Sequence, residues 1–258
     1  MFEYLPQSVK LYLSFVAFLF GAVMGSALNC LAYRMVRGKK WSGGRSVCPH
    51  CGHTLAPRDL IPVVSYLCLK GKCRYCGEKV SKRYVLTEAF LGLCYVTLLL
   101  RFGLSLDLLS GLVLLSCLFS LSLVDLDTQI IPDRFLVIPA VIRIAQLIFE
   151  GNLIGGILPG LIFGGGLLIL SLVMDKILGK DTMGGGDIKL MAVLGLYFSI
   201  PECLLLLILA CVAGIVIASI LMKIKDDTPF PFGPALSLAA YITMLIGEPV
   251  ISWYLSLF

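Results

Sequence analysis

The sequence predicts an all-α polytopic membrane protein with about eight transmembrane helices and a small cytoplasmic zinc-binding loop domain. Three observations lead to this prediction. Of the 258 residues, 59% are hydrophobic and only 14% are charged, whereas about 25% of a soluble domain is charged. Apolar runs recur along the chain, several of them close to the roughly 20 residues that a helix needs to cross a bilayer. Basic residues and paired cysteines gather in one polar insert, residues 34–84.

The first apolar run, residues 11–33, predicts the first transmembrane helix. Its positive flank follows it, so the N-terminus is expected outside, and a cleaved signal peptide would carry its charge ahead of the apolar run. Small and polar residues recur about one turn apart along this run: Gly21, Gly25, Ser26 and Asn29. They indicate either close packing against another helix, with Asn29 hydrogen-bonded to it, or a face that lines a functional site.

The insert at residues 34–84 holds twelve of the 21 lysines and arginines but only two acidic residues, Asp59 and Glu78. Short loops rich in lysine and arginine are retained in the cytoplasm, so we expect this insert to be cytoplasmic. Nucleic-acid binding is the alternative use of such a basic stretch. Anionic lipid headgroups lie beside the insert, which favours membrane lipid as its partner and no nucleic acid.

Seven further spans are expected after the insert: 85–100, 106–124, 135–149, 153–174, 188–200, 203–222 and 233–256. With eight spans, loops 125–134, 175–187 and 223–232 lie on the same side as the insert. The basic residues in and beside these loops agree with a cytoplasmic position: Arg134, Lys176, Lys180, Lys189, Lys223 and Lys225. Arg143 falls inside a span, where it needs a partner or must reach towards the interface.

This count predicts three parts of the chain. They are a first transmembrane helix at 1–33, a cytoplasmic four-cysteine zinc-binding domain at 34–84 and a transmembrane core at 85–258. Because the loops that follow the third and fifth spans share one face, Asp125 and Asp187 are expected at the same, cytoplasmic face of the membrane.

Two Cys-x-x-Cys-Gly units, beginning at Cys48 and Cys73, are separated by twenty-one residues. The four thiolates of Cys48, Cys51, Cys73 and Cys76 can fill the tetrahedral shell of a structural Zn²⁺, and the glycine after each pair tolerates the positive φ of such a turn. Disulfides are the alternative, which a cytoplasmic position disfavours. Since no position remains open, the zinc is expected to fold the loop rather than to act on substrate.

The two histidines, His50 and His53, lie in the same insert and are alternative ligands in a mixed site, although surface or supporting positions are favoured. The other six cysteines fall mostly in apolar runs and are expected to behave as small buried hydrophobic residues: Cys30, Cys68, Cys94, Cys117, Cys203 and Cys211.

Asp125 and Asp187 each follow a long apolar run, and a carboxylate at the end of a membrane span is a functional candidate because it is costly to hold there. Three glycines precede Asp187 and permit irregular backbone and close approach of a substrate. The alternative for Asp187 is a helix cap, favoured by the helix dipole. Asp133 resembles a cap or turn residue, and Asp127 an acid facing water.

These residues resemble the type IV prepilin peptidases, a family of membrane aspartyl proteases. Gly184-Gly185-Gly186-Asp187 fits the Gly-x-Gly-Asp motif, and Asp125 with Ile131-Pro132-Asp133 is similar to the first aspartate motif of that family. The first span and the insert continue the likeness over nearly the whole chain. The similar positions there are Phe20-Gly21, Gly25-Ser26, Asn29, Tyr33-Arg34, Ile61-Pro62, Ser65-Tyr66, Gly71-Lys72-Cys73, Arg83-Tyr84 and Glu88, together with the cysteine pairs.

The resemblance implies that Asp125 and Asp187 are the catalytic pair. Two nearby carboxylates do not both ionise easily, so one keeps a proton and the other takes one from an attacking water. The implied substrate is a prepilin or pseudopilin with a short basic leader, cut after a glycine at the cytoplasmic face of the bacterial inner membrane. Many members with the cysteine loop also methylate the new N-terminus with S-adenosyl-L-methionine, which this chain is expected to do as well.

Two alternatives stand beside this hypothesis. A peptidase without methyltransferase activity fits the same residues, because no glycine fingerprint for S-adenosylmethionine occurs in the sequence. A channel or transporter would use the two aspartates to bind cations, but transporter sites usually lie near the midplane of the bilayer rather than at one face.

Overall fold

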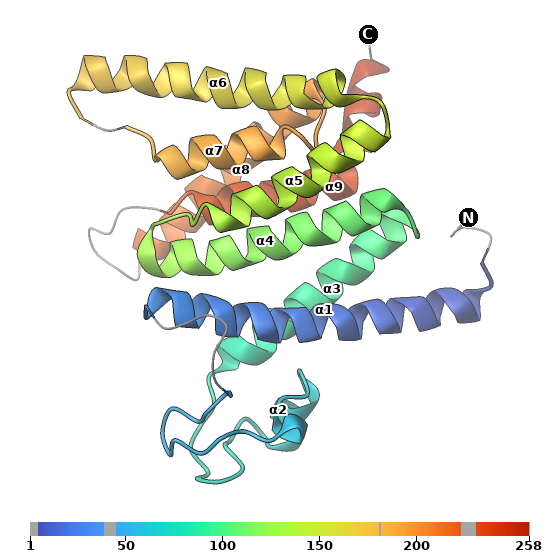
Figure 1. Ribbon diagram of the computed structural model, residues 1–258, viewed down its shortest axis with the longest axis vertical. Coiled ribbons are helices and arrows are strands. Elements are labelled where there is room, and N and C mark those ends of the chain that lie inside the picture. Colours follow the sequence, from blue (N-terminus) through green and yellow to red (C-terminus); the bar gives the residue numbers. More distant parts are fainter. Residues whose placement is uncertain (1–4, 39–44, 181, 223–230, 258) are drawn as a thin grey trace. The chain divides into compact units, whose positions relative to one another are not determined.

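The computed structural model describes residues 5–38, 45–180, 182–222 and 231–257, and the described part is helical with no strand. Figure 1 shows the helices in chain order. They are α1 (Gln7–Val36), η2 (Pro57–Asp59), α2 (Val64–Cys68), α3 (Lys82–Phe102), α4 (Leu106–Thr128), α5 (Arg134–Phe149), α6 (Leu153–Leu178), α7 (Gly185–Leu194), α8 (Ile200–Met222) and α9 (Gly233–Leu255). The chain forms two compact units, Met1–Leu108 and Leu109–Phe258.

Each of the eight predicted spans overlaps a helix in the structure, which confirms the all-α fold class. Within the described ranges, six helices are long and apolar enough to cross a membrane: α1, α3, α4, α6, α8 and α9. The 16 residues of α5 and the 10 residues of α7 are shorter than the others. Within 188–200 the structure differs from the prediction, because α7 ends at Leu194 and the chain turns before α8 begins. Lys223 and Lys225 lie outside the described residues.

In the first unit, α1 packs closely on α3 through small residues. A Cβ on Gly21 would lie 2.8 Å from the carbonyl oxygen of Leu91, and one on Gly25 would lie 3.1 Å from the Cα of Glu88. Nearer the C-terminal end of α1, the buried Asn29 donates a hydrogen bond of 3.1 Å from Nδ2 to the hydroxyl of Thr87. These contacts support the packing interpretation of the small residues in the first span.

In the second unit, α6 packs on α7 and α8 packs on α9 (Figure 1). Arg143, predicted to need a partner, donates a hydrogen bond of 3.1 Å from Nε to the carbonyl oxygen of Leu196. The core of this unit is lined by fully buried leucines of α4 and α7, such as Leu121 and Leu194. This packing holds the C-terminal end of α4 and the first turn of α7, where the two candidate aspartates lie.

Candidate active site and metal centre

The two cysteine pairs of the insert form matching knuckles. In each, the amide of the glycine after the second cysteine donates to the carbonyl oxygen of the first, at 2.9 Å for Gly52 to Cys48 and 3.0 Å for Gly77 to Cys73. These glycines have φ of +68° and +73°, as the sequence predicts. One isolated antiparallel bridge supports each knuckle, Val47 with Thr54 and Lys72 with Lys79.

The knuckles bring the four predicted ligands together. The sulfur atoms of Cys48, Cys51, Cys73 and Cys76 lie within 4.8 Å of one another, and those of Cys48 and Cys76 are 3.9 Å apart. A tetrahedral zinc site with Zn–S bonds of about 2.3 Å needs sulfur atoms about 3.8 Å apart, so the cluster fits this ion. Hydrogen bonds from the backbone of Cys51 and His50 lower the pKa of the Cys48 thiol to about 6, whereas burial and the neighbouring thiols raise the pKa of Cys76, so the four thiols are close enough to affect one another's ionisation.

Neither histidine belongs to the four-sulfur cluster. His50 is exposed, and the ring of His53 stacks on Tyr75 with ring centroids 3.7 Å apart. Both placements agree with the surface or supporting positions expected of them. Of the remaining cysteines, Cys94, Cys117 and Cys203 are buried, as predicted, whereas Cys68 and Cys211 are exposed.

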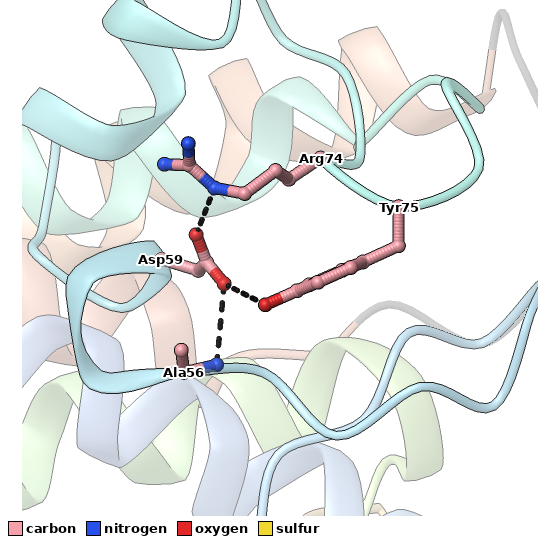
Figure 2. Close-up of polar contacts among 4 residues, drawn as sticks. All are labelled: Ala56, Asp59, Arg74 and Tyr75. Carbon is pink, nitrogen blue, oxygen red and sulfur yellow. Dashed lines mark hydrogen bonds and ion pairs between the residues drawn. The ribbon is translucent and has the colours of Figure 1, made fainter.

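Asp59 ties the turn η2 to the second knuckle, as Figure 2 shows. Its carboxylate accepts hydrogen bonds from Nε of Arg74 at 2.6 Å, from the hydroxyl of Tyr75 at 2.9 Å and from the amide of Ala56 at 3.2 Å. The bond from Arg74 is the main reason that the pKa of Asp59 lies below its ordinary value. Since Arg74 and Tyr75 lie between Cys73 and Cys76, this contact fixes the knuckle relative to the loop before it.

In the second unit, Asp125 lies in the last turn of α4 and is 4% exposed. One carboxylate oxygen, Oδ2, accepts a hydrogen bond of 3.0 Å from the amide of Gly233 at the first turn of α9. A Cβ on Gly233 would lie 2.6 Å from the same oxygen, so only glycine lets the backbone approach this closely. Asp125 therefore meets a helix N-terminus, which stabilises negative charge.

Asp187 lies in the first turn of α7, and the N-cap of that helix is Gly184, so Asp187 is not the cap itself. Its Oδ1 atom is buried and has no hydrogen-bond partner among the described residues. Burial, and after it the negative charge of Asp125, raises the pKa of Asp187 to about 6. The two carboxylates are thus close enough for one charge to affect the other.

Ile131 connects the two aspartates. Its side chain lies against Gly186, where a Cβ would be 2.9 Å from Cβ of Ile131, and against Gly233, where a Cβ would be 3.4 Å from Cδ1. The loop that carries Ile131 is fixed at its far end, because Nζ of Lys189 lies 2.8 Å from Oδ1 of Asp133. The structure therefore brings Asp125 and Asp187 to one site, with glycine backbone on two sides of it.

The remaining predicted acids lie apart from this site in different ways. Asp127 is exposed two residues further along α4. Asp133 occupies the N-cap position of α5, as expected, but its side chain makes no capping hydrogen bond and pairs with Lys189 instead.

Sequence reasoning did not identify Gly233 as part of the site. Its contribution is a backbone amide, which leaves no signature in side-chain chemistry. The only available signal is the sequence Pro231-Phe-Gly-Pro234, because two prolines and a glycine at the start of an apolar run indicate irregular backbone there.

Two family models match this chain. The Bacterial Peptidase A24 N-terminal domain matches residues 19–102, which include the cysteine knuckles. The Type IV leader peptidase family matches residues 112–219, which include both aspartates. The two matches are adjacent and together cover most of the chain.

Curated relatives cover nearly the whole chain. A prepilin leader peptidase/N-methyltransferase of Aeromonas salmonicida is 32% identical over 95% of this chain and 94% of the relative. Proteins of the same name from Neisseria gonorrhoeae and Bacillus subtilis (strain 168) are 36% and 29% identical, over 82% and 94% of this chain and 75% and 98% of the relatives. No solved structure matches the chain.

Proposed function

Because the chain belongs to the type IV leader peptidase family, we propose that it removes the basic leader from type IV prepilins or pseudopilins and methylates the new N-terminus. The single observation that carries the proposal is the shared site of Asp125 and Asp187, one buried and one half-buried carboxylate at the ends of helices in a membrane protein. Cleavage after a glycine at the cytoplasmic face of the bacterial inner membrane is part of the same proposal.

The surroundings of the two carboxylates suggest different protonation states. Asp125 accepts an amide hydrogen bond at a helix N-terminus, which supports its ionised form. Asp187 has a buried oxygen without a partner, and burial together with the charge of Asp125 raises its pKa, which favours the protonated form more than in an ordinary aspartate. Asp125 is accordingly the base and Asp187 the acid of the pair.

In the proposed reaction, Asp125 takes a proton from a water molecule while the oxygen of that water bonds to the carbonyl carbon of the peptide. Asp187 gives its proton to the carbonyl oxygen. The tetrahedral intermediate then collapses: the C–N bond breaks, the proton held by Asp125 passes to the leaving amine, and Asp187 takes back a proton from a hydroxyl group of the intermediate, which becomes the new carboxyl group. No covalent enzyme intermediate forms, and the zinc site takes no part in this step.

The four-cysteine loop is proposed to hold structural zinc, with Cys48, Cys51, Cys73 and Cys76 as ligands. Methyl transfer would use S-adenosyl-L-methionine, which the names of the curated relatives support. The residues that bind this cofactor are not assigned.

The test is to incubate the purified protein with a prepilin and S-adenosylmethionine labelled at its methyl group. We expect a shortened pilin whose new N-terminus carries the label. A cleaved but unlabelled product would support the narrower function, a peptidase alone. An uncleaved prepilin in the presence of zinc-loaded protein would contradict the proposal.

Replacing Gly233 with alanine is expected to lower kcat for leader cleavage by about 10- to 100-fold, because small displacements of a catalytic group have effects of this size. The new Cβ would lie 2.6 Å from Oδ2 of Asp125 and must displace the carboxylate or its amide donor. Gly165→Ala on α6 is the matched control, since a Cβ there meets nothing within 4 Å. Equal rates for the two variants would count against a role for the Gly233 amide.

The pH dependence of cleavage follows from Asp187. A raised pKa keeps this acid protonated below about pH 6, and the proton is lost as the pH rises through that value. The rate of cleavage is therefore expected to fall as the pH rises through the pKa of Asp187. In membranes we expect this fall at about pH 6 or higher, because the bilayer removes further water from the acid and so raises its pKa. The measurement is a pH–rate profile of kcat, and a rate that only rises with pH would contradict the assignment of Asp187 as the acid.

A further inference from the structure

The short helix α2 and the turn before it expose apolar side chains within the polar insert. Four of these side chains are more than two-fifths exposed: Leu60 at 41%, Ile61 at 48%, Val64 at 48% and Leu67 at 64%. These four residues are called the α2 apolar surface below. An apolar surface on a loop that is otherwise basic needs something that covers it, since water alone leaves it unfavourably exposed.

The structure shows how far along the axes of α1 and α3 the α2 apolar surface lies. The amide of Val63, which immediately precedes α2, donates a hydrogen bond of 2.8 Å to Oε2 of Glu88. Glu88 is six residues beyond Lys82, the first residue of α3, so it lies about 9 Å along the helix from that basic end. The start of α2 is therefore held beside the second turn of a membrane-spanning helix.

A contact of helix α1 independently locates the start of α2 at about the same distance from the basic ends of the two helices. Asn29 bonds to Thr87, the neighbour of Glu88, and Asn29 lies five residues before Arg34, or about 8 Å along α1. Arg34 and Lys82 are the basic residues at the ends of these two spans, where headgroups are expected. Both helices thus place the start of α2 on the hydrocarbon side of the basic ends.

The backbone of this turn is strained, and the bond to Glu88 holds it. Val63 has φ of +61° and ψ of −51°, and the amide of Val64 bonds to the carbonyl oxygen of Pro62 at 2.6 Å. This is a classic γ-turn, which is rare and is especially unfavourable for a β-branched residue. Such a conformation persists only where the surroundings enforce it, and here the buried carboxylate of Glu88 does so.

The other side of α2 is occupied by the zinc loop itself. The hydroxyl of Tyr66 lies 3.5 Å from the carbonyl oxygen of Val80, and its ring covers Gly71, where a Cβ would lie 2.8 Å from the hydroxyl oxygen. With Tyr66 directed into the loop, Val64 and Leu67 remain exposed on the surface of this unit.

The charges around α2 are positive. Arg58, Lys70 and Lys72 are exposed before and after it. The nearby acid, Asp59, is already bound by Arg74 and does not oppose them. Basic residues beside an apolar helix surface match the boundary between anionic headgroups and hydrocarbon.

We propose that the α2 apolar surface is an interfacial anchor that inserts into the headgroup–hydrocarbon boundary of the bilayer and seats the zinc loop on the membrane. The occupant is lipid, with anionic headgroups bound by the flanking basic side chains. The inference does not depend on the proposed peptidase activity, because it concerns only the first unit and the membrane that its helices cross.

The test uses a tryptophan at Leu67 in the full-length protein, reconstituted in vesicles of phosphatidylglycerol and phosphatidylcholine with brominated acyl chains. The two native tryptophans, Trp41 and Trp253, are replaced by phenylalanine. Val64→Trp is a second reporter on the same surface, and His50→Trp, at the exposed tip of the first knuckle, is the matched control. Each variant is first shown to bind zinc at the level of the parent protein.

We expect the tryptophan at Leu67 or Val64 to emit at shorter wavelength than the control and to lose most of its emission to brominated lipid but little to acrylamide in the water. The control should show the opposite pattern. Quenching of both reporters by acrylamide alone would overturn the proposal, since the surface would then face water. Resistance of both reporters to acrylamide and to brominated lipid would also overturn it, because protein rather than lipid would then cover α2.

Discussion

Replacing Asp187 with asparagine is expected to lower the rate of leader cleavage by about 100- to 10,000-fold, the range that general acid–base catalysis contributes. Asparagine keeps the size of the side chain but cannot give a proton to the carbonyl oxygen of the substrate. Oδ1 of Asp187 is buried and has no hydrogen-bond partner among the described residues, so the substitution breaks no hydrogen bond at this atom. The measurement is single-turnover cleavage of a purified prepilin.

The matched control for Asp187→Asn is Asp127→Asn, the same change at an exposed aspartate two residues beyond Asp125 on α4. We expect this control to cleave at nearly the rate of the parent protein. Zinc content and thermal unfolding of both variants should be unchanged, because neither residue belongs to the metal centre. Cleavage by Asp187→Asn at the rate of the control would contradict the assignment.

Replacing Cys48 and Cys73 with serine is expected to abolish zinc binding, because two of four thiolates are lost and the remaining two cannot close the tetrahedral shell. The free energy of zinc binding in such sites is largely free energy of folding, so the knuckles should unfold. We expect methylation to be lost with them, because the family resemblance associates the cysteine loop with the members that also methylate. Zinc content by elemental analysis and label transfer from S-adenosylmethionine measure the two effects.

The control for the cysteine variants is Cys94→Ser, which changes a buried cysteine of α3 outside the metal cluster. It should retain zinc. A Cys48/Cys73 double variant that still binds one zinc per chain would show that other residues, such as the two histidines, complete the site.

Much of the fold was predictable because hydrophobic runs report membrane helices directly. The boundaries of α1, α4 and α9 lie within a few residues of those predicted. The prediction differed between 188 and 200, where the sequence stays apolar although α7 ends at Leu194. Gly195 packs there directly against the backbone of Gly160, so a side chain at this position could not be accommodated without a shift.

The candidate site was predictable where side chains carry the chemistry. Four cysteines with a repeated spacing defined the metal cluster, and even the positive φ of Gly52 and Gly77 followed from the turn that ligand pairs need. The hydrogen bond to the Asp125 carboxylate joins residues 108 positions apart, and its donor is the backbone amide of Gly233. The strained turn at Val63 runs against residue preference, so only the structure reveals it.

The central claim is that Asp125 and Asp187 act on one water as a single unit. The most direct test is to compare single-turnover cleavage by Asp125→Asn, Asp187→Asn and the double variant. Residues that act as a unit are strongly non-additive, so we predict that each single variant falls to the same residual rate and that the double variant falls no further. Retained cleavage in either single variant, or a double variant slowed by the product of the two single effects, would contradict the claim.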